Sequence, residues 1–147
     1  MTTTEKAPAP LPCAFAKAVL ARQGRCPLVT MMLEGEAERP CCASPVANTN
    51  CHTLHALLRE RATFALRLPP PASPLVHAAE MRVQCGGLRG LAAALGEPDA
   101  PPPDIHGLVA KARGGFDGLL GIPFDAVVAA MVRWEGRPRA ANGKGAR

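Results

Sequence analysis

The stretch Cys41–Leu68, CCASPVANTNCHTLHALLRERATFALRL, holds three of the six cysteines and two of the four histidines of the chain. Its second half also carries the strongest amphipathic pattern in the sequence, which predicts a helix from about Cys51 to Leu68. The polar residues at positions 48–50 read as a turn, so we expect Cys51 and His52 to begin this helix. The rest of the chain should pack against it.

Arg61 occupies an unexpected place in this predicted helix. At 100° per residue it falls in the middle of the apolar stripe and not on the polar face. It could offset the negative charge of thiolate ligands, or its guanidinium could extend to the edge of the stripe. Cys51 lies at the edge of the same stripe, with His55 one turn later. The predicted stripe comprises Leu54, Leu57, Leu58, Phe64, Ala65 and Leu68.

Composition favours one small helical domain of 147 residues. With four Phe, one Trp and no Tyr, the core must be filled by Ala, Leu and Val, which suits close-packed helices better than a sheet. No apolar run approaches the roughly 20 residues that span a bilayer, and the N-terminus shows no signal-peptide pattern. We therefore expect a cytoplasmic protein, in which six cysteines indicate metal binding or redox chemistry more than disulfides.

The predicted fold class is all-α, a bundle of about five helices with Pro/Gly-rich joints and a loop-rich, cysteine-bearing N-terminal third. The first half of residues 28–40 is ambiguous between a buried helical turn and a short strand. Gly86 and Gly87 should split or bend one helical region, and Asp104 should cap the next. The remaining helices are predicted at residues 13–24, 74–97, 105–113 and 123–135.

Three segments follow from this pattern: a flexible lead at residues 1–12, a single helical domain at 13–136 and a basic disordered tail at 137–147. Residues 133–147 carry five basic residues against one acidic, 5 − 1 = +4 of the formal net charge of +5. The tail has no interleaved aromatics and no recognition motif, so nucleic acid is not an expected partner.

The cysteines follow the pattern Cys13-x12-Cys26-x14-Cys41-Cys42-x8-Cys51-x33-Cys85. No CxxC signature of zinc fingers, thioredoxins or bacterial ferredoxins is present. Most of these cysteines nevertheless flank turns or helix ends, where a cofactor would have room. At a helix N-terminus, the Cys51 thiolate would be stabilised by the helix dipole. The best four-ligand set is Cys13, Cys26, Cys42 and Cys51, with Cys41 competing for the place of Cys42.

An iron–sulfur cluster is the preferred cofactor, because such centres take four thiolates. Zinc is the alternative, with Cys51 and His55 as a local pair and two more thiolates from the N-terminal third. Cys85, followed by two glycines that let backbone approach something bulky, is a candidate fifth thiol. Each cysteine could instead be a packed apolar residue.

Enzymatic activity is not favoured. The sequence has no phosphate loop, GxGxxG, GxSxG or HExxH motif. Cys85 could act as a nucleophile, with His77 two helical turns upstream, but no base is placed beside it by sequence.

The sequence therefore predicts a metal-binding protein in electron transfer, redox sensing or cluster and metal delivery, with a redox or metal-delivery protein as partner. A structural zinc protein is one alternative. The other is a metal-free helical interaction or regulatory module, whose cysteines pack in the core and whose basic tail contacts an acidic partner. No membrane partner is expected, and the oligomeric state stays open.

Overall fold

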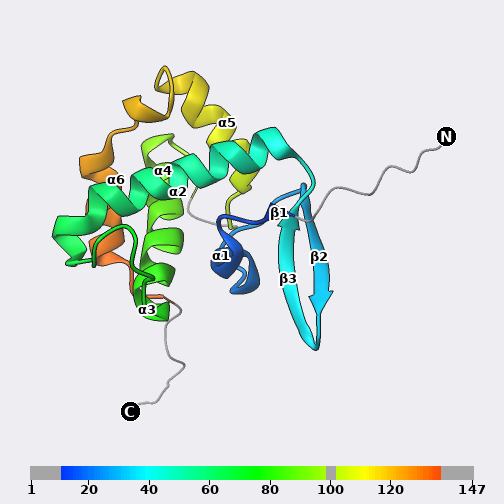
Figure 1. The fold of residues 1–147 in the computed structure, drawn as a ribbon. Coiled ribbons are helices and arrows are strands. Elements are labelled where there is room, and N and C mark those ends of the chain that lie inside the picture. The colour runs from blue at the N-terminus through cyan, green and yellow to red at the C-terminus, as the bar shows by residue number, and fades with distance from the viewer. Residues whose placement is uncertain (1–10, 99–101, 137–147) are drawn as a thin grey trace, which may run out of the picture.

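The computed structural model describes residues 11–98 and 102–136, and it corrects the all-α prediction. Helices pack around the long α2, and a β-hairpin projects from one side of them (Figure 1). The hairpin belongs to a three-stranded antiparallel sheet with strand order β1-β3-β2. The protein is therefore mixed α and β. Its strands are β1 (Leu11–Pro12), β2 (Val29–Glu34) and β3 (Ala37–Cys42).

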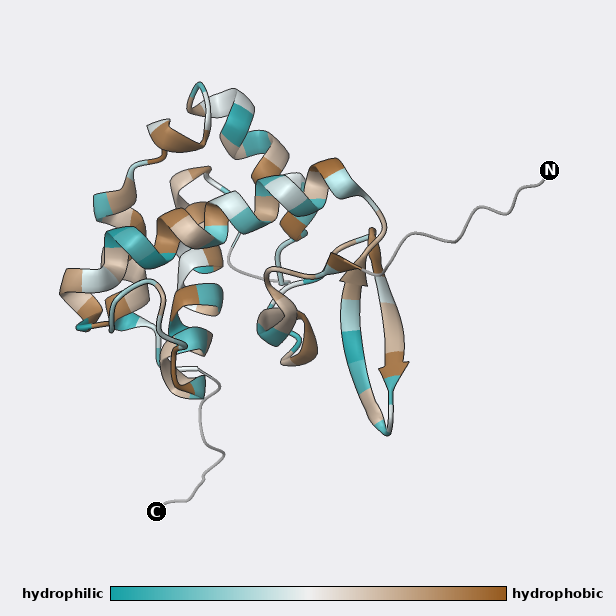
Figure 2. Cartoon of the chain, viewed as in Figure 1, coloured by the Kyte–Doolittle hydropathy of each residue, from teal (hydrophilic) through white to brown (hydrophobic). Residues whose placement is uncertain are grey.

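The hairpin of β2 and β3 forms in the segment whose hydrophobic periodicity did not distinguish a helical turn from a strand. Glu34 pairs with Ala37, so the loop has two residues, Gly35 and Glu36. Gly35 has φ +65°, the conformation that a tight hairpin with glycine at its first loop position requires. Apolar residues run along β2, whereas β3 has a hydrophilic stretch (Figure 2). β2 reads VTMMLE, without the alternation that marks a strand, which is why the sequence did not separate strand from helix.

Leu11 and Pro12, which the sequence assigned to a flexible lead, pair with β3 opposite Cys42 and Cys41. The other residues of the predicted lead, 1–10, and the predicted tail at 137–147 lie outside the described residues. No helix in the described ranges is long and apolar enough to cross a membrane.

The central helix α2 (Pro45–Leu66) begins earlier than predicted. Ser44 caps it by accepting a hydrogen bond from the Ala47 amide at 3.2 Å, and Pro45 occupies the first turn. The polar residues 48–50 are helical and not a turn. Cys51 therefore lies six residues into the helix, and the prediction that it begins α2 is wrong.

The buried stripe of α2 consists of Ala47, Leu54, Leu58 and Ala62. Phe64, predicted to be in the core, is 95% exposed. The stripe packs against helices that follow in the order α3 (His77–Met81), a π-helical turn (Arg82–Gly86), α4 (Gly87–Ala94), α5 (Ile105–Gly115) and α6 (Phe124–Arg133). The short α1 (Ala16–Leu20) adds Ala18 to the same core.

The glycines of the π-helical turn and α4 serve helix packing. A Cβ on Gly86 would lie 2.8 Å from the Cα of Met131, and one on Gly90 would lie 2.9 Å from the Cα of Val127. Both contacts are with α6 backbone. Gly86, the first of the two glycines after Cys85, thus admits a neighbouring helix, and a Cβ on Gly87 would lie 2.8 Å from the Leu58 side chain of α2.

Candidate metal centre

Four cysteines from four different segments line a single cavity. Cys13 follows β1, Cys26 precedes β2, Cys42 ends β3 and Cys51 lies on α2. These are the four cysteines that the sequence grouped as the best ligand set. The other lining residues are Ala14, Leu28, Val29, Ala47, Asn48, Ile105 and His106.

Backbone pairing positions the N-terminal cysteines. The Cys13 amide donates to the Pro40 carbonyl at 3.1 Å, which continues the β1–β3 pairing past the end of β1. Cys26 follows Arg25, whose amide donates to Pro103 at 3.0 Å and whose carbonyl accepts from Ile105 at 2.7 Å. The start of α5 is thereby tied to the segment that carries Cys26, so that Ile105 closes one wall of the cavity.

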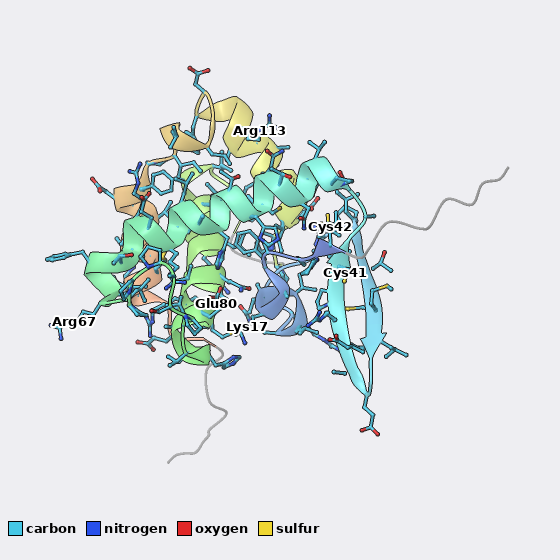
Figure 3. All side chains as sticks on the ribbon, viewed as in Figure 1. Lys17, Cys41, Cys42, Arg67, Glu80 and Arg113 are labelled. Carbon is cyan, nitrogen blue, oxygen red and sulfur yellow. The ribbon has the colours of Figure 1, made fainter. Side chains whose placement is uncertain are left out.

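Strand geometry distinguishes Cys42 from Cys41. Successive strand residues point to opposite faces of a sheet, so two adjacent cysteines on β3 cannot both face the cavity. Cys42 lies opposite Val29, and both line the cavity. Its Sγ donates to the Ser44 carbonyl at 3.3 Å and accepts from the Ser44 amide at 3.5 Å. Cys41 is buried on the other face, and both lie at the base of the hairpin (Figure 3).

The thiols share a low-polarity environment and influence one another. Burial raises the pKa of Cys51 to about 12, with further contributions from Cys13, Cys26 and Cys42. Burial also raises the pKa of Cys13, and the neighbouring thiols add to the effect. Mutual repulsion of this kind arises when several groups that become anionic approach one space. Because the pKa values of Cys13 and Cys51 are raised, these two thiols are protonated at neutral pH.

The cavity that the four thiols line is small. Its volume is about 20 Å³, so its walls would have to move apart to admit a group larger than a water molecule. Its walls are mostly apolar, which limits the access of water. Within the described residues, no three His, Cys, Asp or Glu side chains are grouped closely enough to hold one metal ion. Either a zinc ion or a cluster would therefore require the residues that line the cavity to rearrange around it.

His55 and Arg61 of α2, which the sequence predicted to contribute to the metal site, make their contacts away from the cavity. The Nε2 atom of His55 lies 2.5 Å from Oε2 of Glu80, and its ring stands edge-on to Phe15 at 5.9 Å. The Arg61 guanidinium lies 4.6 Å from the centre of the Phe124 ring. Arg61 is ten residues beyond Cys51 in α2, or about 15 Å along a helix that rises 1.5 Å per residue. Neither side chain lines the cysteine cavity.

Cys85 belongs to the core between helices and not to the cavity. It lies in the π-helical turn, is 1% exposed and packs with the buried cluster around α2 and α6. Burial raises the pKa of Cys85 to about 11, although Arg89 lowers it in part. A reactive thiol has a lowered pKa and access to solvent, so Cys85 has the features of a packed residue.

Asn48 and His106 line the cavity but were not singled out by the sequence. Asn48 also donates to the Pro12 carbonyl at 2.8 Å, which fixes β1 against α2. His106 lies in the first turn of α5. The Asp104 side chain accepts a hydrogen bond from the Gly107 amide and caps this helix as predicted. No sequence signal brings this helix start to the cysteines, because the bridge between Arg25 and Asp104 joins segments far apart in the chain.

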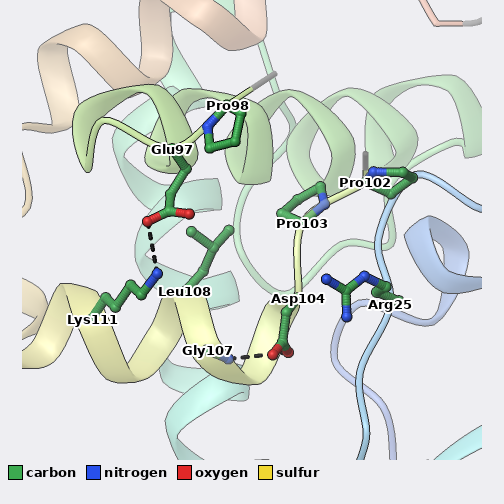
Figure 4. A pocket seen from close by; sticks show the side chains of 9 residues that line it. All are labelled: Arg25, Glu97, Pro98, Pro102, Pro103, Asp104, Gly107, Leu108 and Lys111. Atoms are coloured by element: carbon green, nitrogen blue, oxygen red, sulfur yellow. Dashed lines mark hydrogen bonds and ion pairs between the residues drawn. The ribbon is translucent and has the colours of Figure 1, made fainter. Parts of the chain in front are cut away.

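Arg25 and Asp104 also line a second hollow, together with Glu97 and Lys111 (Figure 4). Its charged groups largely satisfy one another: Lys111 pairs with Glu97 at 2.7 Å, and Asp104 caps α5. The Arg25 side chain at its rim has no hydrogen bond or ion pair to any described residue. This hollow offers no cluster of candidate ligands.

No protein-family model, curated protein or solved structure matches this chain.

Proposed function

We propose that this protein binds an iron–sulfur cluster through Cys13, Cys26, Cys42 and Cys51, and that it works in electron transfer, redox sensing or cluster delivery. One observation carries the proposal: four cysteines that are scattered along the sequence line the same apolar cavity. Chance packing of buried thiols would distribute them through the core, as it does Cys85.

One feature of the arrangement favours a cluster over zinc. Four of the lining side chains are thiols, and His55, the predicted local partner of Cys51 in a zinc site, is engaged with Glu80. His106 is the one imidazole among the lining residues, and it is the nitrogen ligand that a zinc site would use. A cluster held there would supply one-electron chemistry.

The surrounding residues would tune such a centre. Leu28, Val29 and Ile105 form apolar walls that exclude water from the thiolates. Asn48 and His106 supply the only nitrogen-bearing side chains among the lining residues, and both side chains can donate hydrogen bonds. Because the pKa of Cys51 is raised to about 12, its deprotonation depends on the positive charge of bound metal, so metal uptake would release protons.

Single Cys→Ser substitutions test the ligand set. Each of Cys13→Ser, Cys26→Ser, Cys42→Ser and Cys51→Ser should reduce bound iron and sulfide and lower the thermal midpoint of unfolding. Cys85→Ser and Cys41→Ser are matched controls, because both remove a buried thiol that does not line the cavity. The controls should lose stability but keep their metal.

The pattern of losses separates the proposal from its alternatives. Zinc that disappears in the same four variants would replace the cluster by a structural zinc site. Graded stability losses of about 1–3 kcal/mol in all six variants, with no metal in any, would leave a metal-free interaction module.

A further inference from the structure

β2 is an edge strand whose outer hydrogen-bonding groups point away from β3. The Ala43 amide donates to the Leu28 carbonyl at 2.9 Å, so residues 28 and 43 form a hydrogen-bonded pair of the β2–β3 ladder. Hydrogen-bonded and non-hydrogen-bonded pairs alternate in antiparallel sheets, so the N–H and C=O groups of Val29, Met31 and Leu33 point towards the open edge. The Val29 amide donates to the Cys26 carbonyl at 3.2 Å, which leaves the Val29 carbonyl and both groups of Met31 and Leu33 for a further strand.

This edge lacks the features that usually prevent pairing. Natural edge strands are commonly blunted by Lys, Pro or a bulge. β2 has none of these, pairs with β3 without interruption and exposes Met31 by 43%, Met32 by 38% and Leu33 by 77%. Val29, Met31 and Leu33 are on one face of the strand, which gives an apolar row that begins at the cysteine cavity.

We propose that β2 pairs with β2 of a second copy of this chain, antiparallel about a two-fold axis at Met31. A two-fold axis perpendicular to the sheet leaves each side chain on the same face of the joined sheet. A residue at this axis lies opposite the same residue of the second copy. With Met31 opposite Met31, Val29 lies opposite Leu33 of the second copy. Both edge groups of Met31, the Leu33 amide and the Val29 carbonyl then pair across the interface, while the Val29 amide keeps its bond to Cys26. The two apolar rows then join into one continuous surface.

Charge complementarity supports a second copy as the occupant. Residues 29–42 contain three Glu and one Arg, 1 − 3 = −2, whereas the whole chain carries +5, so the remainder carries 5 − (−2) = +7. In the proposed register the turn of each hairpin, with Glu36, extends past the first residue of the other copy's β2, and the exposed Arg25 lies four residues before that strand begins. Within the described residues neither Glu36 nor Arg25 has an ion pair of its own. The pairing would satisfy both.

The inference does not depend on the metal. Two-fold pairing closes the β2 edge, so a dimer and not a fibre results. The cysteine cavities lie at the two ends of the joined hairpins, because Cys42 and Val29 mark the base of each one.

Sedimentation equilibrium of the full chain tests the pairing. The wild type should have a mass near twice the 15.3 kDa chain mass. Met31→Pro removes an outward amide without breaking a β2–β3 hydrogen bond, and it should give the monomer mass. Phe64→Lys, a control at an apolar residue that is 95% exposed on α2, should remain dimeric. If Met31→Pro disturbs the circular dichroism spectrum, Met31→Lys takes its place.

Cross-linking tests the register. Hydrogen-bonded partners have Cα atoms about 5.5 Å apart, within the range that a disulfide spans, so Met31→Cys should cross-link to itself under mild oxidation above the wild-type level. Met32→Cys should not, because residue 32 lies opposite residue 30. A wild type that is monomeric throughout the measured concentrations, or a Met31→Pro variant that stays dimeric, would overturn the proposal.

Discussion

The Nε2 atom of His55 lies 2.5 Å from Oε2 of Glu80, with side chains only 21% and 16% exposed. Glu80 also accepts from Gln84 at 2.7 Å, and Gln84 accepts from the Ala18 amide at 3.0 Å. This chain of hydrogen bonds joins α1, α2, α3 and the π-helical turn. None of these side chains lines the cysteine cavity. His55 lies one helical turn from Cys51, but its imidazole is bound to Glu80.

His55→Ala should therefore destabilise the protein without removing metal. The substitution leaves part of the Glu80 carboxylate without its partner, which costs about 1–3 kcal/mol. Urea denaturation measures this loss, and metal analysis of the same sample should match the wild type. Cys51→Ser, one turn earlier on α2, is the comparison that should lose metal. Loss of metal in His55→Ala at unchanged stability would make His55 a ligand.

The same network predicts a dependence of stability on pH. Burial alone would raise the pKa of Glu80, but hydrogen bonds from His55 and Gln84 and the charges of His55 and Arg59 lower it on balance. A carboxyl whose pKa is lowered by folding stabilises the fold above its ordinary value of 4.5, and this contribution is lost as pH falls below that value.

Glu80→Gln should flatten this acid dependence in urea denaturations on both sides of pH 4.5. Glu60→Gln, at a side chain 70% exposed beside Arg61, should leave it unchanged. An equal pH dependence in Glu80→Gln and wild type would assign the effect to other carboxyls.

Close packing of α4 on α6 gives a prediction about stability. A Cβ at position 90 would lie 2.9 Å from the Val127 Cα and 3.0 Å from its carbonyl oxygen, and backbone cannot easily yield. Gly90→Ala should cost about 1–3 kcal/mol. Gly114→Ala on α5, where a Cβ meets nothing within 4 Å, should instead gain about 0.5–1 kcal/mol. Thermal unfolding of both variants checks the pair, and a Gly90→Ala variant as stable as Gly114→Ala would refute the packing argument.

Cys85 should resist alkylation in the folded protein. It is 1% exposed and burial raises its pKa to about 11, so little thiolate is present or accessible at neutral pH. Peptide mapping after iodoacetamide treatment should find it unmodified in native protein and modified once the chain is unfolded. Rapid modification in the native state would reopen the reading of Cys85 as a nucleophile.

Local signals predicted part of this structure well. Asp104 caps α5 as expected, and Phe124, Val127 and Met131 form the buried face of α6 at the predicted spacing. The four cysteines grouped from the sequence also line one cavity. The two helix features depend on short patterns, which the sequence contains, whereas the shared cavity depends on pairing between distant segments.

Other features depend on contacts between distant segments. The hairpin was missed because VTMMLE has no alternation, and because the pairing with β3 defines the strand. The helix α2 begins at Pro45, after the Ser44 cap, so the polar residues 48–50 that the sequence assigned to a turn are helical. Cys51 therefore lies inside the helix. His106 reaches the cavity only through the bridge between Arg25 and Asp104.

The most direct test of the central claim is to purify the protein without oxygen, record its visible absorption spectrum and measure iron, sulfide and zinc per chain. We predict broad visible absorption with iron and inorganic sulfide in equal and stoichiometric amounts. A colourless protein that contains neither iron nor sulfide, and does not acquire them when supplied with ferrous iron, sulfide and reductant, would contradict the account.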